Sequence, residues 1–234
     1  EAECLKDFMV DSIRMIITTR GFNEGERQAM IDSGGVGPTS ATVAKDAIAV
    51  IVHPQRIDSF FTLQQIKDLV SGKGKENLIP VFDGLSATST VRFMLDSVLR
   101  GGNLGANVVA AESSKGVIDY VAQTPNAIGF VGVSWVGNRD DTAQLSFLKK
   151  IKIARLESTD SAGGYVLPVQ YLIYTNTYPM VRHLVYVLKE NHLGLGTAFG
   201  NFLQSERGQL VFRRSYLQPL LRPFYIRQAE LREE

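Results

Sequence analysis

Apolar and polar positions follow one another along this chain in two distinct patterns. Short, nearly unbroken apolar runs such as 46–54 (DAIAVIVHP) are typical of strands that are buried on both faces of a sheet. Between these runs, apolar residues recur every three or four positions, which is typical of helices with one buried face. Because the two patterns alternate, the sequence predicts an α/β protein with at least one mostly parallel sheet.

The patterns also place the individual elements. The helix at 61–74 has the clearest ends, because Thr62 and Gln65 form a capping box and Gly72 stands at its stop. Thr197 is expected to cap the last helix. Strands are predicted at 12–19, 46–54, 77–83, 126–135, 168–176 and 182–190, and helices at 4–11, 61–74, 89–101, 113–125 and 196–216.

The segment 85–102 (LSATSTVRFMLDSVLRGG) carries more hydroxyl groups than a helix start needs. Ser86, Thr88 and Ser89 precede the apolar stripe of the predicted helix, and Thr90 lies at its edge. A helix amino terminus presents unpaired N–H groups and a partial positive charge, so these hydroxyls could help it to bind an oxyanion. The alternative is one N-cap and several solvated hydroxyls.

A second candidate lies at the end of the strand at 12–19, where Thr18, Thr19 and Arg20 follow one another. The planar guanidinium of Arg20 suits an anion that accepts two parallel hydrogen bonds. The alternative is an ordinary surface arginine after a strand.

Composition excludes several classes of function. The formal net charge of +1 leaves no electrostatic footprint for nucleic acid or an acidic membrane. The single cysteine excludes an internal disulfide and a thiolate metal site, and no apolar run is long enough to span a membrane. The three histidines lack metal-ligand spacing, and no nucleophile–base pair is evident. We therefore expect no enzymatic activity, no metal and no cofactor.

Six stretches in the same order give the chain a likeness that covers most of its length. It resembles the phosphate-type substrate-binding proteins of ABC importers, which belong to the periplasmic binding-protein class. The resembling stretches are 12–22 (SIRMIITTRGF), 46–54 followed by 61–73 (FTLQQIKDLVSGK), 86–95 (SATSTVRFML), 117–132 (VIDYVAQTPNAIGFVG), 178–188 (YPMVRHLVYVL) and 199–220 (FGNFLQSERGQLVFRRSYLQPL).

The resemblance implies a two-lobed periplasmic binding-protein fold of type II, α/β, in which each lobe is a mixed sheet flanked by helices and two crossovers form the hinge. We expect lobe one to comprise 1–55 and 178–234, and lobe two to comprise 56–177. The family normally begins with a strand, a helix and a further strand before the segment 1–20. The chain is therefore expected to lack that amino-terminal part.

The resemblance also implies an extracytoplasmic solute receptor that binds inorganic phosphate between the lobes and delivers it to a membrane-embedded ABC permease. We expect a monomer, periplasmic or tethered by an upstream lipid anchor, with no nucleic acid as partner. Asp83, at the end of a strand, would accept a proton from the oxyanion or orient a hydroxyl. The other expected ligands are Thr18, Thr19 and Arg20 of lobe one, and Ser86, Thr88, Ser89 and Thr90 of lobe two.

Two departures from the family pattern keep other functions open. Some phosphate binders have an aspartate beside the hydroxyl residue at the first strand's end, whereas the stretch 18–21 (TTRG) has no carboxylate. Ser89 also replaces the glycine of the family's Ser-Gly-Thr helix start. The alternatives are a receptor for another tetrahedral oxyanion such as sulfate, a ligand-free structural or signalling module on the same fold, and an enzyme that acts on a phosphorylated substrate.

Overall fold

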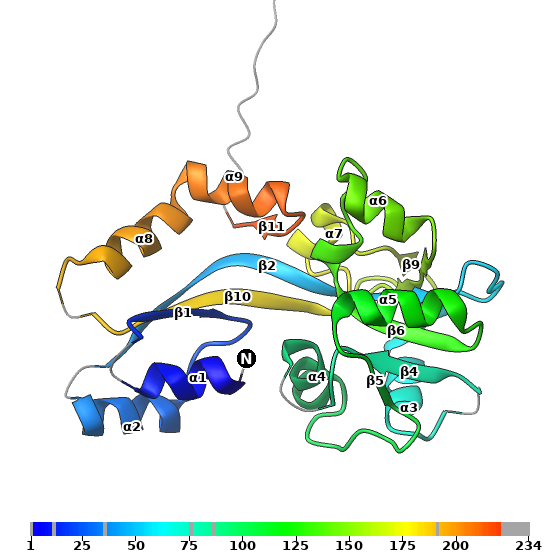
Figure 1. Cartoon of the computed structure of the whole chain (residues 1–234), viewed down its shortest axis with the longest axis horizontal. Helices are drawn as coiled ribbons and strands as arrows, with labels where there is room; N and C mark the ends of the chain where they lie inside the picture. The colour runs from blue at the N-terminus through cyan, green and yellow to red at the C-terminus, as the bar shows by residue number, and fades with distance from the viewer. Residues whose placement is uncertain are drawn as a thin grey trace, which may run out of the picture.

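The computed structural model describes residues 2–10, 13–34, 37–74, 77–85, 88–190 and 192–220. These residues form a main sheet with helices on both faces and a small second sheet (Figure 1). The predicted α/β class is confirmed. The main sheet is mixed rather than mostly parallel, because its antiparallel ladders outnumber the two parallel ones that β4 makes with β5 and β6.

The main sheet has the strand order β1-β10-β2-β6-β4-β5, and β7 and β11 also pair with β2. The small sheet has the order β3-β8-β9. The strands of the main sheet are β1 (Met15–Thr18), β2 (Thr39–Val52), β4 (Ile79–Phe82), β5 (Val109–Ala110), β6 (Ala127–Gly132), β7 (Lys152–Ile153), β10 (Val181–Leu188) and β11 (Gln218–Pro219). Those of the small sheet are β3 (Phe60–Phe61), β8 (Arg155–Glu157) and β9 (Tyr165–Val166).

Strand β2 connects the two ends of the main sheet. Its residues 39–47 pair with β10, and its residues 48–52 pair with β6 on the other edge. We call the end that contains β1, β10 and β11 the β1 side, and the end that contains β4, β5 and β6 the β4 side. The chain thus passes from one side to the other inside a continuous strand. The lobe boundaries expected from the sequence stay a prediction.

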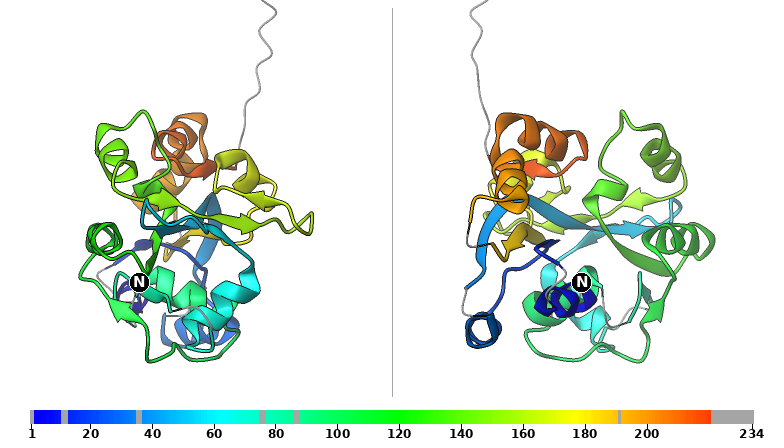
Figure 2. Two further views of the ribbon diagram at one scale, coloured as in Figure 1. Left: turned by 90° about the vertical axis from the view of Figure 1, so that its right-hand side faces the viewer. Right: turned by 60° about the vertical axis from the view of Figure 1, so that its left-hand side comes forward.

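Each side has its own helices and its own apolar clusters (Figures 1 and 2). On the β1 side, α1 and α2 cover one face and α8 and α9 cover the other. On the β4 side, α3 and α4 cover one face and α5 covers the other. The helices are α1 (Ala2–Met9), α2 (Glu24–Gly34), α3 (Leu63–Val70), α4 (Ser89–Phe93), α5 (Ser114–Gln123), α6 (Thr142–Leu148), α7 (Gln170–Tyr174), α8 (Leu195–Gln204) and α9 (Glu206–Arg214), with a π-helical turn η1 (Met94–Val98) and a 3₁₀ turn η2 (Val133–Trp135).

Local chemistry explains the best-defined helix and the passage between the sides. Thr62 Oγ1 accepts the Gln65 N–H and Gln65 Oε1 accepts the Thr62 N–H, so the predicted capping box of α3 is confirmed.

The return of the chain towards β10 is anchored by Tyr178, which is 1% exposed. Its hydroxyl donates to the Ile48 carbonyl at 2.8 Å. Burial raises the pKa of this phenol, so the hydroxyl remains a donor.

Two predictions of secondary structure are wrong. The apolar run at 168–176 is a helix, α7, and not a strand. Val169, Leu172 and Ile173 are three and four residues apart, and the last two contact the core of the β4 side, so the helical period was present in the sequence.

The predicted helix at 196–216 is broken into α8 and α9 at Ser205, whose extended backbone and side chain cap α9. Thr197 is not the cap of α8, because the helix begins after Gly194. The Thr197 hydroxyl donates to Glu190 Oε2 instead.

Candidate functional site

A hollow of about 470 Å³ lies where the two sides of the molecule meet. Thr19 and Arg20 line it from the end of β1, Arg182 lines it from β10, and Phe93 and Ser97 line it from α4 and η1. A second hollow of about 580 Å³ shares Arg20 and Gly21 with the first. It is otherwise lined by Phe22 and Asn23, which precede α2, and by residues of α4 and η1. Elements from both sides therefore form the walls.

Three of the four hydroxyl residues predicted for the β4 side lie at the start of α4, but none of these three lines either hollow. Thr88 caps the helix, because its Oγ1 accepts the Val91 N–H at 3.3 Å. Ser89 Oγ accepts a hydrogen bond from Arg182 Nη1 at 3.0 Å. Thr90 is 2% exposed, so it faces the interior. Ser86 lies outside the described residues, and its role stays a prediction.

The residues predicted for the β1 side have different surroundings. Thr18 is buried, and its hydroxyl donates to the Arg20 carbonyl at 2.6 Å, so it stabilises the turn after β1. Thr19 and Arg20 line the hollow of about 470 Å³. Of these three residues, the structure therefore brings two to the walls between the sides.

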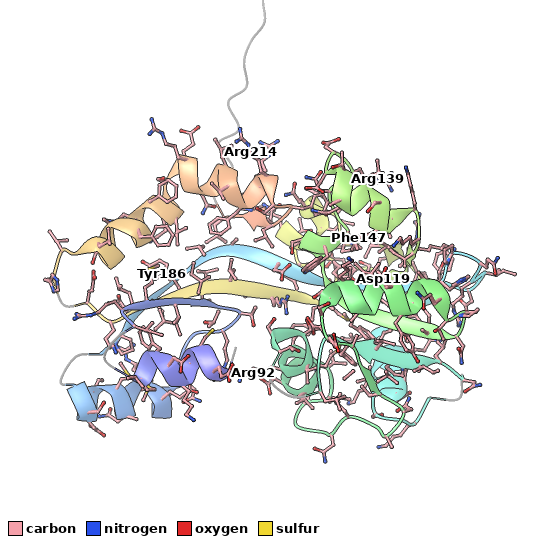
Figure 3. All side chains as sticks on the ribbon, viewed as in Figure 1. Arg92, Asp119, Arg139, Phe147, Tyr186 and Arg214 are labelled. Atoms are coloured by element: carbon pink, nitrogen blue, oxygen red, sulfur yellow. The ribbon has the colours of Figure 1, made fainter. Side chains whose placement is uncertain are left out.

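Arg20 already has an anionic partner. Its Nη1 and Nη2 donate to Glu26 Oε2 and Oε1 at 2.7 and 2.8 Å, which is a bidentate ion pair with α2. These hydrogen bonds are the main reason that the pKa of Glu26 is lowered. The charge of Arg92 on α4, labelled in Figure 3, lowers the pKa of Glu26 further. Positive charge from both sides of the molecule thus acts on one carboxylate.

Asp83 follows β4 and is followed by Gly84, whose φ of 135° favours glycine. Its Oδ2 accepts a hydrogen bond from the Ser114 hydroxyl at 3.0 Å, at the start of α5. Its Oδ1 is buried and has no hydrogen-bond partner among the residues that the structure describes. Asp83 therefore orients one hydroxyl and retains an acceptor that a further donor could use.

An ion pair that the sequence analysis missed joins the two long strands beside α4. Asp46 on β2 and Arg182 on β10 are opposite each other in the ladder, and both are nearly buried. Arg182 Nε donates to Asp46 Oδ2 at 2.8 Å, and Nη2 lies 2.6 Å from the same oxygen. The signal was a charged residue at the start of each of the predicted strands 46–54 and 182–190, because a buried charge needs a partner.

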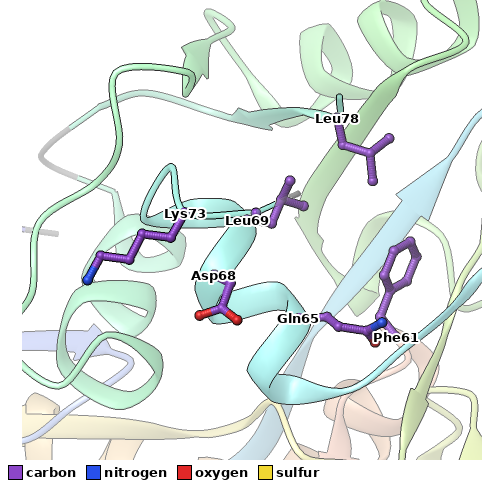
Figure 4. A pocket seen from close by; sticks show the side chains of 7 residues that line it. Phe61, Gln65, Asp68, Leu69, Lys73 and Leu78 are labelled. Carbon is purple, nitrogen blue, oxygen red and sulfur yellow. The ribbon is translucent and has the colours of Figure 1, made fainter. Parts of the chain in front are cut away.

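A third hollow, of about 310 Å³, lies against α3 and contains none of the predicted ligands (Figure 4). Its floor is apolar, with Phe61, Leu69 and Leu78. Lys73 also lines it, and two of its polar side chains, Gln65 and Asp68, already hydrogen bond within or next to α3. We therefore assign the candidate site to the hollows between the two sides.

Two kinds of feature are absent from the described residues, namely a metal-binding cluster and a membrane-spanning helix. No three His, Cys, Asp or Glu side chains within the described ranges gather in a way that could hold a metal ion. Among the helices of the same ranges, none combines the length and apolar character needed to cross a membrane.

Comparison with known proteins identifies similar sequences and folds. The chain is 26% identical over 226 residues to the phosphate-binding protein PstS of two Pseudomonas aeruginosa strains, PAO1 and UCBPP-PA14. The match covers 86% of this chain but only 66% of each relative, so the chain spans slightly less than two thirds of their length.

Solved structures share the fold. One is a substrate-binding protein assigned to a phosphate ABC transporter of Clostridium perfringens, with bound phosphate: the TM-score is 0.71 at 23% identity, over 93% of this chain and 83% of that one. Another is an ABC-type phosphate transport receptor from Vibrio cholerae, with a TM-score of 0.70 at 16% identity, over 93% and 84%. The two-lobed fold expected from the sequence is confirmed. A model of the PBP superfamily domain matches residues 1–207, and the chain therefore belongs to the PBP superfamily.

Proposed function

We propose that this protein is an extracytoplasmic solute receptor that binds inorganic phosphate between its two sides and delivers it to an ABC permease. The observation that carries the proposal is the hollow of about 470 Å³, in which Thr19, Arg20 and Arg182 meet the α4–η1 segment. Hydroxyl and guanidinium donors from separate parts of the chain suit a tetrahedral oxyanion. The names of the similar Pseudomonas, Clostridium and Vibrio proteins, all phosphate-binding or phosphate-transport proteins, support the choice of phosphate.

Binding between two sides also supplies a way to signal that the receptor is loaded. Arg20 belongs to the β1 side, whereas Ser89 belongs to the β4 side. An anion can contact both sets of donors only when the sides are close together, so it favours the closed arrangement. A permease that recognises this arrangement would receive loaded receptors selectively. The receptor itself performs no turnover.

Asp83 would help the protein to distinguish protonated phosphate from sulfate. Its buried Oδ1 is an acceptor without a donor among the described residues, and an HPO₄²⁻ ion carries a proton that it could donate. Sulfate is fully ionised at neutral pH and has no such proton. This role requires the anion, or a bridging hydroxyl, to reach the end of β4.

Isothermal titration calorimetry with phosphate, arsenate and sulfate tests the proposed function. We expect saturable binding of phosphate and of its isostere arsenate, and much weaker binding of sulfate. The protein should be freed of bound anion first by partial unfolding and dialysis. Binding of sulfate in preference to phosphate would assign a different oxyanion, and binding of none of the three would contradict the proposal.

A ligand-free module on the same fold is the second candidate. The bidentate pair between Arg20 and Glu26 favours it, because the protein's own carboxylate occupies donors that an anion would use. In that case the two sides would keep one arrangement whether or not phosphate is present. Unchanged small-angle scattering and unchanged thermal stability on addition of phosphate would support this candidate against the receptor.

A further inference from the structure

We propose that Arg182 is the main cation that binds the anion, and that Asp46 is a positioning residue that holds Arg182 in place. This inference deepens the proposed function and rests on it. The sequence pattern suggests Arg20 as the cationic ligand. The hydrogen bonds of the two arginines point to Arg182 instead.

The two arginines differ in how their carboxylate partners hold them. Both terminal nitrogens of Arg20 donate hydrogen bonds to the two carboxylate oxygens of Glu26. The guanidinium edge that carries these two nitrogens is therefore directed at the carboxylate. Asp46 contacts Arg182 through Oδ2 alone, at Nε and Nη2, because its Oδ1 accepts the Ala47 N–H at 2.8 Å. The side of Arg182 that carries Nη1 is therefore turned away from its carboxylate.

Arg182 lines the proposed site and has N–H groups beyond those that contact Asp46 and Ser89. A guanidinium carries five N–H groups, and the contacts with Asp46 and Ser89 account for three of them. Arg182 lines the hollow of about 470 Å³ together with Thr19 and Arg20. An oxyanion in the hollow could thus accept hydrogen bonds from Arg182 without displacing Asp46.

Burial makes this cation effective. Arg182 is 9% exposed and Asp46 is 6% exposed, so their interactions are weakly screened by solvent. The pair is neutral when the site is empty, which makes the burial of the arginine tolerable. When an anion binds, Arg182 is shared between two anionic groups. Because Arg182 is on β10 and already contacts Ser89 on α4, the same side chain would link the anion to both sides of the molecule.

The test is calorimetric titration of phosphate into the wild-type chain and three variants. Arg182→Gln removes the cation but leaves Asp46 buried and unpaired. The double variant Arg182→Gln/Asp46→Asn is therefore measured as well, because its two neutral side chains can hydrogen bond to each other. We expect both to weaken phosphate binding on the order of a hundredfold, since two charge-assisted hydrogen bonds are lost. Arg182→Lys keeps the charge without the fork and should recover part of the affinity.

Arg155→Gln serves as the matched control, because Arg155 is an exposed arginine on β8 and does not line the hollow. Its affinity for phosphate should equal that of the wild type. If the wild type binds phosphate and the folded double variant binds it equally well, the assignment of Arg182 is wrong while the receptor function stands. If the wild type binds no oxyanion, both the assignment and the proposed function fall.

Discussion

Glu26 holds the guanidinium of Arg20 by both of its carboxylate oxygens, and this pair sets the electrostatics of the β1 side of the site. An incoming anion must compete with the carboxylate for the same donors or bind elsewhere. The pair is about one third exposed, so solvent screens it and its net stabilising effect is small. The competition is therefore measurable by substitution without a large loss of stability.

Replacing Glu26 with Gln should strengthen phosphate binding. The substitution keeps a hydrogen-bonding side chain but removes the negative charge, so Arg20 becomes more available to the anion. We expect the affinity for phosphate to rise by roughly three- to tenfold, because the anion would gain about one charge-assisted hydrogen bond from Arg20. Calorimetry at low salt measures it. Glu24→Gln, on the first turn of the same helix, is the control for the general change in charge. Equal effects of the two substitutions would exclude a specific role of the pair.

Asp83 gives a prediction about selectivity rather than affinity alone. If its Oδ1 accepts the proton of the bound anion, Asp83→Asn should weaken binding of phosphate and reduce the preference for phosphate over sulfate by about tenfold. Competition titrations of the two anions at pH 7 measure this ratio. Ser114→Ala, which removes the donor to Oδ2, is the control for a purely structural role. Unchanged affinity and pH dependence in Asp83→Asn would dismiss the assignment.

His183 on β10 gives a prediction about stability and pH. Partial desolvation of the imidazole, and secondly the charge of Lys45, lower the pKa of His183 below its ordinary value of 6.5. The unfolded chain therefore binds this proton more readily than the folded one, and stability falls as the pH drops through 6.5 towards the folded-state pKa. Urea unfolding at pH 7.5 and pH 5.5 should show a smaller acid destabilisation in His183→Gln than in the wild type. An equal loss in both proteins would contradict this contribution.

At the scale of elements, the packing of α5 on β6 depends on a glycine. A Cβ on Gly129 would lie 2.7 Å from Val117, 2.8 Å from Val121 and 2.9 Å from Ile51. Gly129→Ala should therefore overpack this core and destabilise the protein by about 1–3 kcal/mol. Chemical denaturation measures the loss. Gly163→Ala is an informative comparison, because its Cβ would meet nothing within 4 Å and its cost would come only from its φ of 77°.

Elements with strong local signals could be predicted from the sequence, and elements that depend on packing could not. The capping box of α3 and the apolar run of 46–54, whose residues 46–52 lie in β2, are fixed by side chains close in sequence. The sequence analysis does not predict helix α2, because residues 24–34 are mostly polar and show little apolar periodicity. The run at 168–176 was misread as a strand, because apolar stretches of this length fit both patterns.

The same division applies to the candidate site. The hydroxyl residues before α4 and at the end of β1 were visible as motifs. The ion pairs of Arg20 with Glu26 and of Arg182 with Asp46 were not foreseen. Asp46 and Arg182 are 136 residues apart, and only the pairing of β2 with β10 brings them together. Their register is set by the sheet, which local spacing does not reveal.

At the scale of the whole molecule, ligand binding and stability are linked. A receptor that binds phosphate only when folded gains about 2.7 kcal/mol of unfolding free energy when free phosphate is a hundredfold above its Kd. Thermal unfolding followed by circular dichroism should therefore shift to higher temperature with phosphate. Sodium chloride at the same ionic strength is the control. No shift at saturating phosphate would contradict selective binding to the native state.

Strand β2 supplies one row of hydrogen bonds to β10 and another to β6 without a break in the chain. If the chain were divided anywhere within residues 39–52, each fragment would have an incomplete set of the hydrogen bonds that β2 makes with β10 and β6. Neither half should therefore be obtainable as a separate folded fragment. Heating the intact protein should melt the apolar clusters of both sides in one cooperative step, although they are packed by different helices.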